Sequence, residues 1–231
     1  PLPTQRRIVA KLDSLFARIE QMKSSMERIP QLLKAFRQSV LTQAVTGKLT
    51  EEWREGKELE EWKKANLGNL IIDTPKNGAY YHRSLYGTGT KIIRIDCFYD
   101  GKLKDWELVQ RVNIDEKDKR IYKIENGDIL INRVNSMEYL GKCLLVDNLL
   151  EDCIFESNMM RVIVNKTFLM PEYTRIFLIS GKGLSELRKN AKQAVNQASI
   201  NQQDIKAVEV VYPSLIEQQE IVCQVESLFA K

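Results

Sequence analysis

Two polar stretches of the sequence carry side chains that suit contacts with DNA. The first, residues 76–91 (KNGAYYHRSLYGTGTK), interleaves tyrosines with lysine, arginine and asparagine. The second, residues 132–136 (NRVNS), directly follows the apolar run GDILI. An arginine can bind guanine through two hydrogen bonds, and an asparagine can bind adenine in the same way. The residues that we expect to contact double-stranded DNA are Lys76, Asn77, Tyr80, Tyr81, Arg83, Lys91, Asn132, Arg133, Asn135 and Ser136.

Each stretch also has a purely structural interpretation. Residues 76–91 could form a glycine-rich hairpin with aromatic side chains on its surface. Asn135 and Ser136 could shape a turn, because both residue types bond to the neighbouring backbone. Arg133 could form a salt bridge with a nearby carboxylate such as Glu138. The sequence alone leaves both interpretations open.

A third polar run, residues 192–204 (KQAVNQASINQQD), precedes a predicted short helix. Ser199 and Gln202 have the spacing of a capping box, so we assign residues 199–202 to structure. Lys189, Lys192 and Gln193 are candidates for contacts with phosphate groups, which position a protein on a duplex.

No pattern in the sequence indicates catalysis, a cofactor or a metal site. The Gly-Lys pairs lack the upstream glycine of a phosphate-binding P-loop. His82 is the single histidine, and we expect it in an exposed loop. The four cysteines, Cys97, Cys143, Cys153 and Cys223, are irregularly spaced and fit reduced structural thiols in a cytoplasmic protein.

The elements that must hold these loops begin with a helical segment over residues 1–55. Its apolar residues step alternately by four and three, which is typical of a coiled-coil seam. We expect an N-cap at Thr4, a kink or break at Pro30 and a helix end near Gly47. The alternative is an amphipathic helix packed on its own domain. The predicted interface of this arm is Ile8, Leu12, Leu15, Phe16, Ile19, Met22, Met26, Leu33, Phe36 and Val40.

After a charged connector the hydrophobic period changes. Residues 56–66 are dense in charge, and Trp53 and Trp62 are expected to anchor this region on its neighbours. Short β-branched runs predict strands within residues 91–103, 124–133, 142–147, 159–165 and 208–213. Residues 171–191 predict helix, interrupted around Gly181–Gly183. Strands and helices without regular alternation predict an α+β fold, with a mixed β-sheet domain attached to a long coiled-coil-forming arm.

The two ends of the chain repeat each other. The segment Ser14-Leu15-Phe16-Ala17 returns as Ser227-Leu228-Phe229-Ala230, and the match extends upstream to Gln5 and Gln218. The chain also lacks an initiator methionine, so we expect a piece of a longer protein in which a second arm begins near residue 213.

Charge and hydropathy add broad limits. The net charge of +4 permits binding to DNA without requiring it. No stretch approaches the ~18 consecutive apolar residues of a membrane helix, and no secretory leader is present, so a cytoplasmic location is expected.

Three stretches resemble the DNA-specificity subunit of type I restriction–modification enzymes. Residues 36–54 (FRQSVLTQAVTGKLTEEWR) resemble the end of that family's conserved spacer helices. Residues 126–142 (NGDILINRVNSMEYLGK) resemble a strand and loop of its target recognition domains. Residues 196–222 (NQASINQQDIKAVEVVYPSLIEQQEIV) are similar to the exit from such a domain into the next spacer.

This resemblance implies four regions: a helical spacer (1–55), the connector (56–66), a target recognition domain (67–212) and a truncated second spacer (213–231). It implies a non-catalytic subunit that directs methyltransferase and restriction subunits to a bipartite DNA site, with possible self-association through the arm. Two alternatives stay open: the recognition region of a single-chain restriction–methylation enzyme, and a coiled-coil interaction protein that does not bind DNA.

Overall fold

The computed structural model describes residues 1–99, 101–195 and 197–230 and has two compact units, Pro1–Ser39 and Val40–Lys231. The first unit is helical and consists of the amino-terminal part of α1 (Leu2–Thr46). The predicted seam residues from Ile8 to Phe36 are exposed there, whereas Val40 is buried in the core of the second unit. Val40 therefore does not belong to an exposed seam, contrary to the expectation.

Two expectations about α1 need correction. The helix begins at Leu2, so Thr4 lies inside it instead of capping it, and the Thr4 amide donates to the Pro1 carbonyl. The helix also continues through Pro30, so a break, one of the two outcomes expected there, does not occur. Proline removes one backbone donor, but this part of the helix is exposed, so water can satisfy the carbonyl that is left without a partner. The predicted end at Gly47 is confirmed, since Gly47 takes a φ of +79° directly after Thr46.

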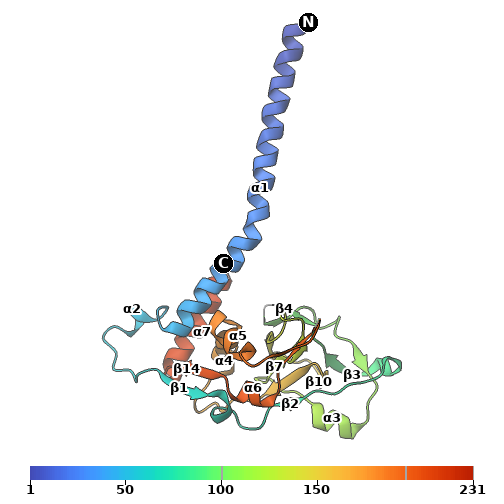
Figure 1. The fold of residues 1–231 in the computed structure, drawn as a ribbon, viewed down its shortest axis with the longest axis vertical. Coiled ribbons are helices and arrows are strands. Elements are labelled where there is room, and N and C mark those ends of the chain that lie inside the picture. Colours follow the sequence, from blue (N-terminus) through green and yellow to red (C-terminus); the bar gives the residue numbers. More distant parts are fainter. Residues whose placement is uncertain (100, 196, 231) are drawn as a thin grey trace. The chain divides into compact units, whose positions relative to one another are not determined.

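The second unit combines short helices with small sheets, which confirms the predicted α+β class (Figure 1). Figure 1 shows α4, α5 and α7 at the end of this unit that holds β1 and β14, with β3 and β10 at the other end. The helices are α2 (Glu51–Arg54), α3 (Glu116–Tyr122), α4 (Pro171–Ile179), α5 (Gly181–Arg188), α6 (Gln202–Lys206) and α7 (Leu215–Phe229), with 3-10 turns η1 (Leu67–Asn69) and η2 (Arg83–Leu85).

Among the described residues of this unit, the strands form five sheets. The largest has the order β2 (Lys76–Asn77), β11 (Met159–Val162), β7 (Ile129–Asn132), β9 (Cys143–Leu145). Two sheets have three strands: β10 (Cys153–Phe155), β3 (Tyr86–Ile93), β6 (Arg111–Val112), and β12 (Lys192–Gln193), β13 (Ala198–Ser199), β8 (Val134–Asn135). The remaining pairs are β1 (Lys63–Asn66) with β14 (Glu209–Tyr212), and β4 (Phe98–Tyr99) with β5 (Lys102–Leu103).

The four-stranded sheet separates two apolar cores. Successive strand residues point to opposite faces, and all four residues of β7 are buried. Ile129 and Ile131 therefore enter the larger core, which also holds residues of α4 and α7, while Leu130 enters the second core with Phe155. Because β7 is buried on both faces, the loop that follows it has a rigid base.

Three local predictions need correction. Residues 91–103 are not one strand but the end of β3 followed by the β4–β5 pair. Part of the charged connector forms β1, which pairs with β14. The short helix α6 is present, but its capping box is Asn201 with Asp204, not Ser199 with Gln202, because Ser199 is a strand residue paired with Val134.

Other expectations are confirmed. Helices α4 and α5 are separated at Ser180, next to the predicted interruption. Trp62 packs against the larger core, and its indole N–H donates to the buried carboxylate of Glu217 at 3.2 Å. All four cysteines are free, and burial raises the pKa of the Cys143 and Cys153 thiols to about 12. Among the described residues no helix is long and apolar enough to cross a membrane.

Candidate nucleic-acid interface

The first polar stretch is held against the turn between β10 and β11. The amide of Gly78 donates to the carbonyl of Met159, and that of Ala79 donates to the carbonyl of Phe155. A Cβ atom on Gly78 would lie 2.2 Å from the carbonyl oxygen of Glu156. Glycine is therefore required for this close approach, which places β2 and Tyr80 beside the turn at residues 156–158.

The second polar stretch lies on the other side of the same turn. The amide of Arg133 donates to the carbonyl of Asn158 at 2.8 Å, and its Nη1 donates to the carbonyl of Ser157 at 3.1 Å. The turn thus lies between the two stretches that the sequence predicts as DNA-contacting loops, although 40 residues (92–131) separate those loops along the chain.

The third polar stretch continues the same row. Strand β13 pairs with β8, with Asn135 opposite Ala198 and Val134 opposite Ser199. Strand β12 pairs with β13, with Lys192 opposite Ser199. Residues 76–80, 156–158, 133–136, 197–199 and 192–195 therefore form one laterally bonded row, which we call the interface row.

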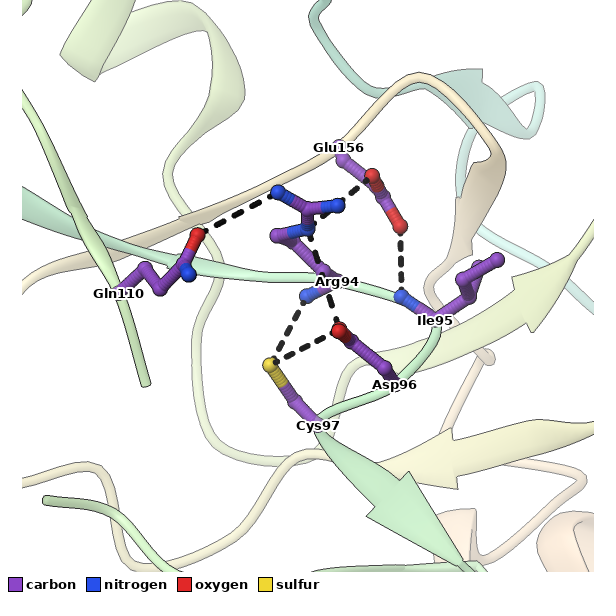
Figure 2. A network of polar contacts seen from close by, with 6 residues as sticks. All are labelled: Arg94, Ile95, Asp96, Cys97, Gln110 and Glu156. Carbon is purple, nitrogen blue, oxygen red and sulfur yellow. Dashed lines mark hydrogen bonds and ion pairs between the residues drawn. The ribbon is translucent and has the colours of Figure 1, made fainter. Parts of the chain in front are cut away.

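A polar network holds the turn of the interface row from behind (Figure 2). The Glu156 carboxylate accepts a 2.6 Å hydrogen bond from the amide of Ile95, and its other oxygen lies 3.7 Å from Nε of Arg94. Arg94 also donates to Gln110 at 3.3 Å, as Figure 2 shows. Burial of the Glu156 side chain raises its pKa, and its contacts with Ile95 and Arg94 oppose that effect. The network ties the turn to the end of β3.

Helix α5 fixes the far end of the Arg133 loop. The guanidinium of Arg188 donates to the carbonyl of Leu140 from Nε at 2.9 Å and from Nη2 at 2.8 Å, and to the carbonyl of Glu138 at 3.0 Å. The loop is therefore held at both ends by backbone contacts, which is the rigidity that a recognition surface needs.

Most of the predicted contact residues lie at the surface. Tyr80 is 79% exposed, and Lys189 makes a long, 4.0 Å ion pair with Glu186. Arg133 and Ser136 are half-buried. The exposed members of the predicted set are Lys76, Asn77, Tyr80, Arg83, Lys189, Lys192 and Gln193.

Four predicted residues are instead buried or bonded within the protein. Lys91 is 3% exposed, and its Nζ donates to the carbonyls of Trp106 and Val109. Asn132 is 1% exposed, because β7 is buried up to its last residue. The Tyr81 hydroxyl donates to Asp118. Burial raises the pKa of Tyr81 most, and the hydrogen bond to Asp118 raises it further. The side-chain oxygen of Asn135 accepts from the amide of Ser136, as in the turn-shaping interpretation.

Sequence reasoning missed Ser157 and Asn158, whose carbonyls organise Arg133. The available signal was the Ser-Asn pair between two apolar runs, a common turn composition.

The interface row carries more exposed cations than carboxylates: Lys76 and Lys192 are exposed, and Glu156 is buried and paired with Arg94. The ion pair with Glu138, the alternative role of Arg133, is not formed in the described structure, where Glu138 contributes its backbone carbonyl to Arg188.

Comparisons with known proteins identify the family of the chain. The family described as "Type I restriction modification DNA specificity domain" matches residues 59–231. The EcoKI specificity subunit of Escherichia coli K12 is 35% identical over 233 residues, covering 100% of this chain and 50% of that protein. The chain thus spans about half the length of such curated relatives.

Solved structures share the fold. A structure from a study of assembly and conformational transition in a type I restriction–modification system superposes with a TM-score of 0.62 at 20% identity, covering 100% of this chain and 52% of the other. The HsdS subunit from Thermoanaerobacter tengcongensis gives 0.57 at 19% identity, covering 98% and 50%.

Proposed function

Because the chain belongs to the type I restriction modification DNA specificity domain family, we propose that it recognises double-stranded DNA by sequence. In this role it has no catalytic activity and directs methyltransferase and restriction subunits to one half of a bipartite target site. Its place of action is then the cytoplasm, where the chromosomal DNA lies.

The observation that supports this proposal most is the interface row. Three polar stretches that are far apart in the sequence meet there through backbone hydrogen bonds. Cations, amides, hydroxyls and an exposed tyrosine lie along it. A surface that binds DNA needs cations for the phosphates and hydrogen-bonding side chains for the base edges. The proposed contact set is Lys76, Asn77, Tyr80, Arg83, Arg133, Ser136, Lys189, Lys192 and Gln193.

We further propose the division of labour along the chain. Residues 1–55 act as a helical spacer, 56–66 as a connector, 67–212 as the recognition domain and 213–231 as the start of a second spacer. The exposed seam of the first unit, from Ile8 to Phe36, is the surface for self-association or for the methyltransferase subunits. The relatives' double length is consistent with a chain that supplies one recognition domain where they have room for two.

A binding experiment tests the proposal. Methylome mapping of a host with and without the intact gene defines the target sequence. The chain, assembled with its cognate methyltransferase subunits, is then titrated with target and scrambled duplexes over a salt series. We expect tighter binding to the target by about 10³-fold or more, with affinity for both duplexes falling as salt rises.

Equal affinity for the two duplexes would refute sequence recognition. Absence of salt-dependent binding to any duplex would instead favour the coiled-coil interaction protein without a DNA role. A methyltransferase domain fused to the same gene would favour the single-chain enzyme.

A further inference from the structure

The hairpin formed by β12 and β13 is unusually open to solvent. Lys192, Gln193, Ala194, Val195 and Gln197 are all exposed, and Val195 is 99% exposed. The amide of Ala194 donates to the carbonyl of Gln197 at 2.7 Å, and the reverse bond is 3.4 Å. These bonds close a tight hairpin, which we call the ribbon (residues 192–195 and 197–199).

The pairing of the ribbon decides which side chains share a face. Gln193 lies opposite Ala198, Lys192 lies opposite Ser199, and Ala194 is bonded to Gln197. Side chains alternate along a strand, and directly opposed residues point the same way. Ala198 is 2% exposed and belongs to the larger core, so its face is the inner one. The outer face therefore carries Lys192, Ala194, Gln197 and Ser199, with Val195 at the tip.

The outer face matches the chemistry of one base pair. In the major groove adenine offers an acceptor and a donor that the carboxamide of glutamine can bind together, and thymine offers a methyl group for an apolar side chain. A two-stranded ribbon fits into that groove. Gln197 and Val195 supply the amide and the apolar group within two positions, and Lys192 supplies a cation for the flanking phosphate.

Resting on the proposed function, we propose that the outer face of the ribbon enters the major groove and reads an A·T pair, Gln197 binding the adenine and Val195 the thymine methyl group. The ribbon adjoins β8 and hence the Arg133 loop, so both can face one duplex. A single exposed valine carries no information by itself. Here it stands at the tip of a cationic, amide-bearing ribbon at the end of the interface row.

The test selects bound duplexes from a randomised pool with the chain assembled with its methyltransferase subunits. Variants Gln197→Ala and Val195→Ser are compared with wild type, together with Gln203→Ala and Leu150→Ser as controls. Gln203 is exposed on α6, and Leu150 is 73% exposed, so both controls remove a similar side chain away from the ribbon. We expect the two ribbon variants to lose about tenfold or more of their preference for A·T at one position, while the controls keep the wild-type motif.

A second arm uses the selected duplex with that thymine replaced by deoxyuridine, which lacks the methyl group. Wild type should bind the deoxyuridine duplex less well, and Val195→Ser, which lacks the apolar side chain, should bind both duplexes equally. If wild type selects a motif and the ribbon variants select the same motif, the inference is overturned while the proposed function stands. If wild type selects no motif, the proposed function fails and the inference fails with it.

Discussion

At the scale of single residues, Arg133 and Lys192 occupy neighbouring elements but differ in surroundings. Arg133 is half-buried and its Nη1 is bound to Ser157, whereas Lys192 is exposed on the edge strand β12. We expect Arg133→Ala to cost ~1–3 kcal/mol on the target duplex and little on scrambled DNA. Lys192→Ala should weaken both alike and reduce the salt slope by about one. Affinity measured over a salt series separates the two.

Arg133→Lys is the control for charge, since lysine keeps the positive charge but cannot form the bidentate pair of hydrogen bonds that a guanidinium forms. It should behave like Arg133→Ala on the target. Because Arg133 also holds the turn at Ser157, the melting temperature must be measured for each variant. A lowered melting temperature with an unchanged target-to-scrambled ratio would make Arg133 a structural residue.

Glu156 gives the fold a distinct pH dependence. Its pKa in the folded state is raised from 4.5, chiefly by burial, so the folded protein binds the proton more tightly than the unfolded chain. Stability linked to this group is present in full below pH 4.5 and is lost as pH rises through the folded-state pKa. Relative to Glu156→Gln, wild type should therefore become less stable over that window in urea unfolding experiments.

Glu151→Gln is a control of opposite sign. A hydrogen bond from Arg111 lowers the pKa of Glu151, so wild type should gain stability relative to that variant as pH rises. The same slope for both variants would contradict the assignment.

Gly78 tests the contact between the first loop and the turn. A Cβ atom there would lie 2.2 Å and 2.4 Å from the carbonyl oxygens of Glu156 and Phe155, and backbone atoms cannot move aside as a side chain would. We expect Gly78→Ala to lower the free energy of unfolding by ~1–3 kcal/mol. Thermal melts measure this loss. In the same melts the control Gly181→Ala should be neutral or slightly stabilising, because no atom lies within 4 Å of the added Cβ and because alanine favours helix at the start of α5. Equal losses in both variants would refute the explanation.

At the scale of elements, the stability of the first unit, the helical segment Pro1–Ser39, depends on what covers its apolar seam. Leu12 and Leu15 are each 45% exposed in this chain. Replacing both with Asp would place charges in an apolar contact between helices, which is costly. We expect Leu12→Asp/Leu15→Asp to lose helical signal in circular dichroism at concentrations where wild type associates, while the β-sheet signal of the second unit remains.

The matched control is Ala17→Asp/Ser24→Asp, which adds the same charge on the side of the helix away from the seam. Heptad spacing places these residues opposite the seam positions. An equal loss of β-sheet signal in the seam variant would show that the two units do not fold separately.

At the scale of the whole molecule, the two copies of the internal repeat differ in burial. In α7, Ile221 and Val225 are buried, and the buried Gln218 bonds to the backbone of Met170, Phe168 and Pro213. Their counterparts in α1, Ile8, Leu12 and Gln5, are exposed. The same sequence pattern thus packs on a domain in one copy and is open in the other.

We therefore expect the chain to self-associate through residues 4–46 or to dock onto methyltransferase subunits. Sedimentation velocity over a concentration series should show a dimer or larger species for wild type and a monomer for Leu12→Asp/Leu15→Asp. A strict monomer at high concentration, together with no binding to the methyltransferase, would contradict this.

The sequence by itself determined the features that depend on neighbours along the chain. The seam spacing of α1, its end at Gly47, the division of α4 from α5 and the α+β class all follow from local periodicity and turn residues. Local rules failed where a stronger competitor stood nearby: Asn201 caps α6 because the strand pairing of Ser199 with Val134 removes Ser199 from the helix start.

Only the tertiary structure decided which polar residues meet. Outside the β12–β13 hairpin, the interface row is built from backbone pairings between residues that are far apart in the sequence, such as Arg133 with Asn158 and Gly78 with Met159, and no periodicity encodes such pairings. The sequence predicted Lys91 and Asn132 as exposed residues that contact DNA. Both lie at buried positions of strands, and they are only 3% and 1% exposed. Burial depends on what the whole fold packs against a strand, and a residue's own neighbours in the sequence do not report it.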